Sequence, residues 1–183
     1  MFRNLVLVAF VLALAPVPLR ADQVERKNSQ IFDDITRQVN SYPQFTVFDD
    51  VNASVEQGVV TLTGDVTMPY KRTDIERRVS RVAGVKEVRN QIEVLPVSIY
   101  DNRLRYAIAR AIYGNPSFWS YAAMANPPIH IVVKGGHVTL TGVVNSNVER
   151  VLARSLASSF GAFSVDNRLQ TDAEMNAALA RLN

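Results

Sequence analysis

Side chains able to hold a metal or transfer protons are few in this sequence. The chain has two histidines, His130 and His137, and no cysteine. The histidines lie seven positions apart across a predicted hairpin, where opposite strand positions could bring them together around a metal ion. No cysteine or clustered carboxylate completes a ligand set of the size that metals need. A solvated hairpin tip is the simpler interpretation, and we predict no metal site and no cofactor.

The remaining polar residues indicate binding rather than catalysis. The serines and acids form no nucleophile elbow, no carboxylate pair and no phosphate-binding loop. Without cysteine the chain also lacks a thiol nucleophile and cannot form disulfides. We therefore predict that the protein is not an enzyme.

A cationic stretch offers a different chemistry, the attraction of anions. Between Lys71 and Arg89 the sequence carries seven Lys and Arg residues against three acids. Arg77, Arg78 and Arg81 project outward if the apolar residues at helical spacing around them face the core. They are candidates for binding anionic lipid or an acidic partner. An ordinary solvated helix face is the alternative.

Three aromatic residues stand close together in a segment that has no counterpart elsewhere in the chain. Phe118, Trp119 and Tyr121 lie in an insertion, residues 117–128, and Trp119 is the only tryptophan. Amphipathic aromatic side chains favour the headgroup level of membranes, so all three are candidates for lipid contact. Burial between structural units is the alternative.

The elements that position these side chains are present twice. Val59–Val66 reappears as His137–Val144, 78 positions on (137 − 59), and Gly84–Ile92 matches Gly161–Leu169, 77 positions on (161 − 84). Between these matches, Ile75 and Val79 align with Leu152 and Leu156, which are also 77 positions further on. Repeated order and spacing indicate two copies of one structural unit.

Each copy has the pattern helix, strand, strand, helix, strand. Apolar and polar residues alternate in the repeated strand, with Leu62 and Leu140 on its apolar side, which is typical of a sheet covered on one face. The isolated strand glycines Gly64 and Gly142 indicate a bulge or a close backbone approach. The prediction is an α+β protein of two tandem αββαβ domains, each a three-stranded mixed sheet covered on one face by two helices. Units this small are marginal alone, so we expect the copies to pack together.

The repeated motif, a V-T-L-T-G-x-V strand, an amphipathic helix and G-V-x-x-V-x-N-x-I, resembles the BON domain, named for bacterial OsmY and nodulation proteins. The resemblance covers nearly the whole chain after its first residues, in two tandem copies, as in an OsmY-like periplasmic protein. It implies an αββαβ fold, an envelope location and a non-catalytic role in binding phospholipid or envelope partners.

The first residues have the features of a secretory signal. Arg3 precedes an apolar run of 11 residues, Leu5 to Ala15, and Ala21 is a small residue suited to cleavage. A cut after Ala15 is disfavoured because Pro16 would follow it. We therefore expect residues 1–21 to be a signal peptide. Without cysteine the exported protein cannot be a lipoprotein, and we expect it in the periplasm.

Removal of that signal changes the charge balance. Without Arg3 and Arg20 the chain keeps 18 of its 20 Lys and Arg residues against 17 acids, although the full sequence has a pI near 9.4. The mature protein is therefore about neutral, and we predict no nucleic-acid partner. Any electrostatic partner must be held by a local patch.

The expected domains are 22–96 and 97–183, the second with the aromatic insertion and a short C-terminal helix. The function that we expect is binding of anionic phospholipid surfaces in support of envelope integrity, including during envelope or osmotic stress. The alternative is a stress-related, chaperone-like module that binds other envelope proteins. Arginines and aromatic residues on one exposed face would favour lipid, whereas a buried aromatic cluster would favour protein partners.

Overall fold

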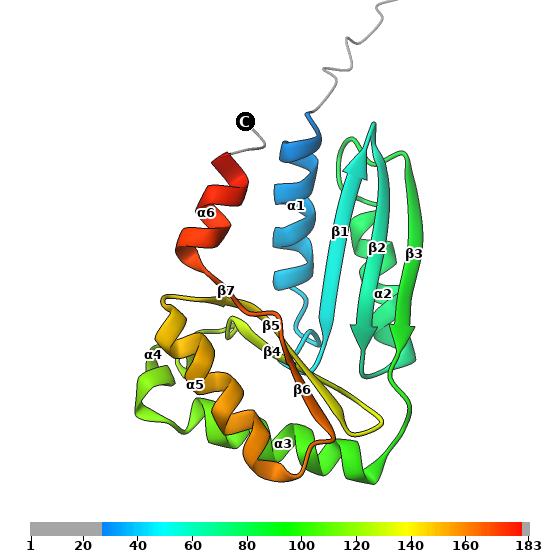
Figure 1. Ribbon diagram of the computed structural model, residues 1–183. Helices are drawn as coiled ribbons and strands as arrows, with labels where there is room; N and C mark the ends of the chain where they lie inside the picture. The colour runs from blue at the N-terminus through cyan, green and yellow to red at the C-terminus, as the bar shows by residue number, and fades with distance from the viewer. Residues whose placement is uncertain (1–26, 181–183) are drawn as a thin grey trace, which may run out of the picture.

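The computed structural model describes residues 27–180, with side chains through residue 177. The predicted signal peptide and the first residues of the predicted first helix lie outside this range. Two helix-and-sheet units stand side by side (Figure 1), and each follows the order helix, strand, strand, helix, strand. The α+β prediction of two tandem αββαβ units is confirmed.

The first unit is a mixed sheet with two helices on one face. Strand β1 pairs antiparallel with β2, and β2 pairs parallel with β3, so β2 is central. The apolar faces of the helices and strands share one buried core. The elements are α1 (Asn28–Asn40), β1 (Asp50–Glu56), β2 (Val59–Val66), α2 (Pro69–Val79) and β3 (Glu87–Val94).

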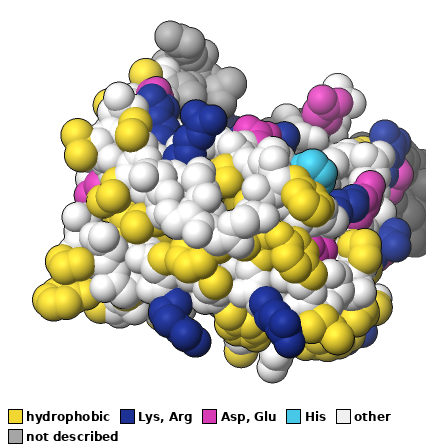
Figure 2. Space-filling view, turned by 60° about the horizontal axis from the view of Figure 1, so that its bottom comes forward, with side chains coloured by type: hydrophobic (Ala, Val, Ile, Leu, Met, Phe, Trp, Pro, Cys, Tyr) yellow, Lys and Arg dark blue, Asp and Glu magenta, His cyan; other side chains and the backbone are white. Residues whose placement is uncertain are grey.

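The second unit repeats this plan with additions around it. Its last strand is interrupted, but both parts pair with β5 in one register, each residue 27 positions after its partner (164 − 137 and 170 − 143). Figure 2 views the molecule from the side of α3, which lies at the bottom of Figure 1. The elements are α3 (Ile99–Tyr113), η1 (Pro116–Phe118), α4 (Trp119–Ala122), β4 (Ile129–Lys134), β5 (His137–Val144), α5 (Asn147–Ala157), η2 (Ser158–Phe160), β6 (Ser164–Asn167), β7 (Gln170–Thr171) and α6 (Asp172–Ala180).

The strand glycines mark a close approach of two backbones in both copies. Gly64 and Gly142 have φ values of +115° and +111°. A Cβ atom would lie 2.1 Å from the carbonyl oxygen of Asp50 in the first copy, and 1.8 Å from that of Pro128 in the second. The positive φ and the short distance to the facing carbonyl oxygen each exclude a side chain at these positions. This confirms the interpretation that two backbones approach closely there.

The repeat alignment of the second helix was wrong by one residue. The buried residues of α2 include Ile75 and Val79, and those of α5 are Ala153 and Ala157, 78 positions further on. The leucines that the sequence aligned, at positions 152 and 156, are only half-buried. Helical spacing fits the leucine pair and the neighbouring pair Ala153 and Ala157 almost equally well. Packing of α5 against the sheet buries the small alanines.

A conserved position in the two copies ties the last strand to the preceding helix. The side-chain amide of Asn90 donates to the carbonyl oxygen of Arg72 at 3.1 Å, and that of Asn167 donates to the carbonyl oxygen of Arg150 at 2.9 Å. These amides satisfy backbone acceptors near the helix-sheet boundary. Both amides therefore have a structural role.

The two copies pack on each other through the segment before β1. The Val47 carbonyl oxygen accepts a 2.7 Å hydrogen bond from the Ile131 N–H, and the Asp49 carbonyl oxygen lies 2.7 Å from Nδ1 of His130. The ring of Phe48 packs against the core of the second copy and meets Tyr106 edge-on at 5.0 Å. A connection of the first copy thus covers the free edge of β4.

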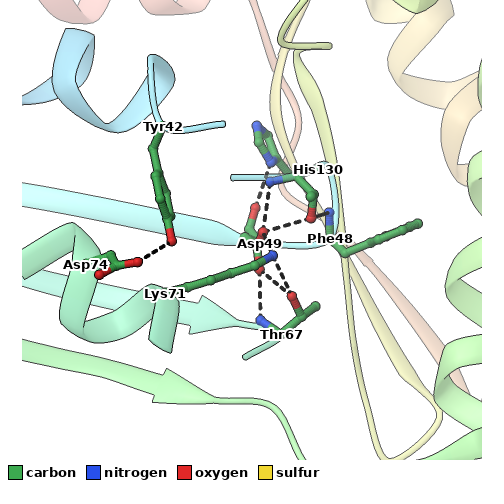
Figure 3. Close-up of polar contacts among 8 residues, drawn as sticks. Tyr42, Phe48, Asp49, Thr67, Lys71, Asp74 and His130 are labelled. Carbon is green, nitrogen blue, oxygen red and sulfur yellow. Dashed lines mark hydrogen bonds and ion pairs between the residues drawn. The ribbon is translucent and has the colours of Figure 1, made fainter. Parts of the chain in front are cut away.

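A buried carboxylate fixes that connecting segment (Figure 3). Asp49 is fully buried, and Lys71 is 3% exposed. One carboxylate oxygen accepts from the N–H and hydroxyl of Thr67, both at 2.8 Å. The other accepts from the Lys71 ammonium at 2.6 Å and from the N–H and hydroxyl of Thr46 at 2.8 and 2.7 Å. Burial raises the pKa of Asp49, but these donors outweigh it and hold that pKa below its usual value.

The first prediction tests the strand register. Leu62→Ala and Leu140→Ala should each lower the free energy of unfolding by about 2–5 kcal/mol, because both side chains are fully buried. Thr61→Ala and Thr139→Ala, on the opposite faces of the same strands, should cost far less. Urea unfolding of the four variants measures the difference. A larger loss in the threonine variants would mean that the strand faces are reversed.

The second prediction concerns the buried carboxylate and acid. The folded pKa of Asp49 lies below the unfolded value of about 3.8, so its stabilisation is present above that pH and disappears as the pH falls through the folded pKa. Asp49→Asn should cost about 3–5 kcal/mol at pH 7, because it leaves the Lys71 ammonium buried without a counter-charge. Below about pH 4, the free energy of unfolding of this variant should also fall less steeply with pH than that of the unmodified protein.

Thermal unfolding between pH 2 and 7 measures both effects. Asp166→Asn is the matched control, because Asp166 also forms an ion pair, with Arg168, but is exposed. It should change stability by less than about 1 kcal/mol. Equal acid dependence in Asp49→Asn and the unmodified protein would contradict the assignment.

Candidate functional site

The three arginines predicted to bind anions lie on α2, but two of them have partners. Arg77 forms a 3.2 Å ion pair with Asp74. The guanidinium of Arg78 lies 4.7 Å from the ring centroid of Tyr42, whose hydroxyl donates to Asp74 at 2.8 Å. Burial, followed by the bond to Asp74, raises the pKa of Tyr42 to about 12. Arg81 alone of the three has neither an ion pair nor an aromatic contact within residues 27–180.

The aromatic insertion divides between core and surface. Phe118 is fully buried and Tyr121 is 4% exposed, and both belong to the core of the second copy. The Tyr121 hydroxyl donates to the Glu149 carboxylate at 2.6 Å, and burial followed by this bond raises the pKa of Tyr121 to about 12. Their assignment to a lipid-binding surface was wrong, because these rings fill the end of the second core. Trp119 is 65% exposed and remains a surface residue.

The predicted arginines and Trp119 do not form one site. Helices α2 and α4 lie at opposite sides of the molecule (Figure 1). A flat membrane surface cannot engage both helices at once in this arrangement. The residues that sequence reasoning selected are therefore not brought together.

A different surface gathers exposed apolar side chains with free cations. It is the outer face of the helix layer that α3 and α5 form over the second sheet. Figure 2 shows hydrophobic side chains spread across this side, with Lys and Arg side chains projecting between them. We call it the outer helix face. Its residues are Ile99, Arg103, Tyr106 and Arg110 of α3 and Val148, Val151 and Arg154 of α5, together with Trp119 of α4, a helix that contacts α3.

The apolar residues of the outer helix face are unusually exposed for their size. Ile99, Tyr106 and Val148 are 73%, 62% and 77% exposed. On α3 the buried residues Leu104, Ile108 and Ile112 face the core, so the exposed stripe is a second apolar surface on the same helix. Apart from Tyr106, whose ring also meets Phe48, these side chains indicate an interaction surface rather than packing within the protein.

The cations of the outer helix face have no counter-ions. Arg103, Arg110 and Arg154 make no ion pair with any residue in the described range. The nearby acids are engaged elsewhere. The buried Asp101 carboxylate accepts from the N–H groups of Gly135 and Gly136 at 2.9 and 2.8 Å, and Glu149 accepts from Tyr121. The face therefore presents positive charge that its own structure does not neutralise.

Aromatic side chains extend this surface at the start of α3. Tyr100 stacks on Phe163 at 6.1 Å between centroids, and Phe163 meets His137 edge-on at 5.9 Å. Phe163 is 73% exposed. Sequence reasoning missed these residues and the α3 stripe. The spacing of Ile99, Arg103, Tyr106 and Arg110, at i, i+4, i+7 and i+11, was the available signal.

The histidines do not meet. His130 lies opposite Thr141, and His137 lies opposite Lys134 at the other end of the hairpin. His130 contacts the Asp49 carbonyl oxygen, and Nδ1 of His137 lies 2.8 Å from the Ser164 hydroxyl. No group of three or more histidines and acids among residues 27–180 is placed to hold a metal ion.

The capping residues of the last two helices show how the insertion changed one of them. At α6, Thr171 and Glu174 form a reciprocal capping box, with bonds of 3.3 and 2.8 Å. At α5, Ser146 caps the helix, but the Glu149 carboxylate accepts from the Asn145 N–H and from Tyr121 instead of from the Ser146 N–H. The Tyr121 hydroxyl thus donates to the Glu149 carboxylate in place of the Ser146 N–H, which would be the donor in a capping box.

In the part of the chain that the structure describes, no helix combines the length and the apolar composition that crossing a bilayer requires.

Comparisons with known proteins agree with the repeat. A family model described as the BON domain matches residues 27–96 and 102–173. No curated protein is significantly similar to the chain. Among solved structures, CdsD, a structural protein of the type III secretion system of Chlamydia trachomatis, is 14% identical, with a TM-score of 0.29, covering 82% of this chain and 97% of that one. The C-terminal domain of CdsD is also 14% identical, with a TM-score of 0.28, covering 79% and 98%.

The two family matches cover most of the described chain, and each lies on one of the two helix-and-sheet units. The family is associated with the bacterial envelope and is not known for catalysis. The chain belongs to the BON domain family, as two tandem copies of the domain.

Proposed function

We propose that the protein is a periplasmic envelope protein that binds anionic phospholipid surfaces through the outer helix face of its second copy. The observation that carries this proposal is the coincidence of exposed apolar residues with three arginines that lack counter-ions. Amphipathic helices with this composition lie in the headgroup region of anionic membranes. Its role would be to support envelope integrity, including under envelope or osmotic stress.

The two kinds of residue contribute comparable free energies. Each basic residue near an anionic surface is worth about 1 kcal/mol, so Arg103, Arg110 and Arg154 together supply roughly 3 kcal/mol. That alone corresponds to weak, salt-sensitive binding. Insertion of Ile99, Trp119 and Val148 adds apolar burial at about 25 cal/mol per Å², which salt does not screen. A useful affinity requires both.

The location is part of the proposal, since export depends on residues outside the described range. We propose cleavage after Ala21, which leaves a nearly neutral mature chain. The intact mass of the protein recovered from the periplasm should correspond to residues 22–183. A product that retains residues 1–21, or that stays in the cytoplasm, would contradict both the location and the function.

The third prediction compares two pairs of arginines in liposome co-sedimentation. Arg103→Glu with Arg110→Glu should weaken binding to phosphatidylglycerol vesicles by at least about thirtyfold at low salt, because at least 2 kcal/mol of attraction is lost. Arg77→Glu with Arg81→Glu is the matched control, with the same change in charge on α2. Its loss should be much smaller, because Tyr70 is the one large exposed apolar residue of α2, too little to hold that helix at the membrane.

Three results would contradict the proposal. A larger loss of vesicle binding in the α2 variant would mean that Arg77, Arg78 and Arg81 form the binding site. Equal pelleting of the unmodified protein with neutral and anionic vesicles would remove the electrostatic part. Pelleting with neither would favour the alternative, recognition of other envelope proteins.

The fourth prediction separates the apolar part from the electrostatic part. Trp119→Ala should weaken vesicle binding at every salt concentration, by roughly tenfold, for a loss of about 1–2 kcal/mol. Its stability should change little, because the ring is exposed. Phe118→Ala is the contrasting variant and should cost about 3–5 kcal/mol of folding stability, because that ring is buried. Unchanged binding in Trp119→Ala would exclude it from the contact.

A further inference from the structure

A cleft between the two copies lies away from the outer helix face and shares no residue with it. It encloses about 580 Å³. Phe32 of α1 and the consecutive residues Asp50–Ala53 of β1 form its first-copy wall, and Val143, Gln170 and Met175 form part of its second-copy wall. In Figure 1 this is the region where α1 and β1 face β7 and α6. Residues with side chains on both faces of β1 line the cleft, so the strand presents its edge.

The turn between β1 and β2 determines which backbone groups of β1 point into the cleft. Gln57 and Gly58 have φ values of +51° and +84°, as in a two-residue hairpin turn. The flanking pair, Glu56 and Val59, is therefore a hydrogen-bonded pair, and such pairs alternate along the ladder. It follows that Val51, Ala53 and Val55 direct their N–H and C=O groups away from β2.

The outward groups of Val51 and Ala53 have no hydrogen-bond partner among residues 27–180. They lie in the cleft, whereas Val55 lies beyond the residues that line it. A strand edge in this state is a template for another extended backbone.

Two of the other sheet edges, those of β3 and β4, are protected. Along β3, the exposed residues include Glu87, Arg89 and Glu93, and charged side chains discourage strand addition. The edge of β4 is covered by the first copy, through the bond from the Ile131 N–H to the Val47 carbonyl oxygen. The β1 edge carries neither protection within the cleft: Asp50 is the only charged residue that β1 contributes there, and Arg168 lies on the wall of the second copy. The interface at Val47 thus continues directly into an open strand edge.

We propose that this cleft binds an extended segment of a partner polypeptide as an additional strand on β1. The partner backbone would bond to the free groups of Val51 and Ala53. Apolar side chains on the partner segment would contact Phe32, Val143 and Met175. An acyl chain fits the cleft less well, because hydrocarbon would cover these backbone groups without satisfying them, which costs about 1–3 kcal/mol for each group.

The test uses a labelled peptide of alternating threonine and valine, about eight residues long and flanked by lysines, as the probe. Fluorescence anisotropy with the full mature protein should show saturable binding. A depsipeptide counterpart, in which esters replace the central amides, keeps the extended shape but lacks the N–H donors. It should bind about tenfold more weakly, as expected for the loss of one or two hydrogen bonds.

Two proline variants place the contact on β1. Ala53→Pro removes an N–H group that points into the cleft and leaves the β2 ladder intact, so it should also weaken peptide binding about tenfold. Val55→Pro removes the equivalent group outside the cleft and should leave binding unchanged. Circular dichroism establishes that each variant is folded, and the depsipeptide comparison decides the question if Ala53→Pro is not.

The outcomes divide clearly. Equal affinity for the peptide and the depsipeptide, equal loss in both proline variants, or no peptide binding up to millimolar concentration would overturn the proposal. Displacement of the peptide by laurate, together with equal binding of the depsipeptide, would identify an acyl-chain cleft instead. Because the outer helix face is separate, vesicle binding should be unaffected by Ala53→Pro, and failure of either proposal leaves the other standing.

Discussion

The arrangement of the whole molecule depends on one buried ion pair, between Asp49 and Lys71. The carboxylate is fully satisfied by donors from three parts of the first copy, so the segment before β1 is held in one position. That segment inserts Phe48 against the core of the second copy and covers the edge of β4 with Val47. Removing the Asp49 carboxylate from water costs free energy, and the ion pair with its hydrogen bonds offsets that cost. Two small units, each marginal alone, are thereby fixed relative to each other.

The two copies have the same plan but different surfaces. At corresponding helix positions, the first copy has Lys71, which reaches back to Asp49, and the second has Glu149, which reaches back to Tyr121. Each side chain ties its helix to the preceding connection, with opposite charge and a different partner. Outside this tie, the first copy pairs many of its charges within itself, whereas the second leaves apolar residues and arginines exposed together. The two copies thus share a stable frame, and they differ in the residues that they expose.

The fixed geometry also separates the outer helix face from the cleft. The outer helix face covers one side of the second sheet, while the cleft opens between the copies along β1. A membrane could therefore be engaged without closing the strand edge. Such an arrangement would allow the protein to hold an extended polypeptide near a lipid surface. The separation follows from the interface at Val47 and Phe48, because a looser junction would neither shape the cleft nor protect the adjacent edge of β4.

The sequence alone determined the repeat, the αββαβ order, the strand faces and the glycines of close approach, because these depend on short-range periodicity and backbone sterics. It did not determine the register of α5, since two neighbouring stripes fit the helical period and only packing against the sheet selects Ala153. Nor did it determine which members of the aromatic insertion are buried. Phe118 and Trp119 are adjacent and chemically alike, yet one fills the core and the other faces solvent. Tertiary structure alone decided this, because only the position of the helix end over the second sheet fixes which ring finds apolar neighbours on all sides.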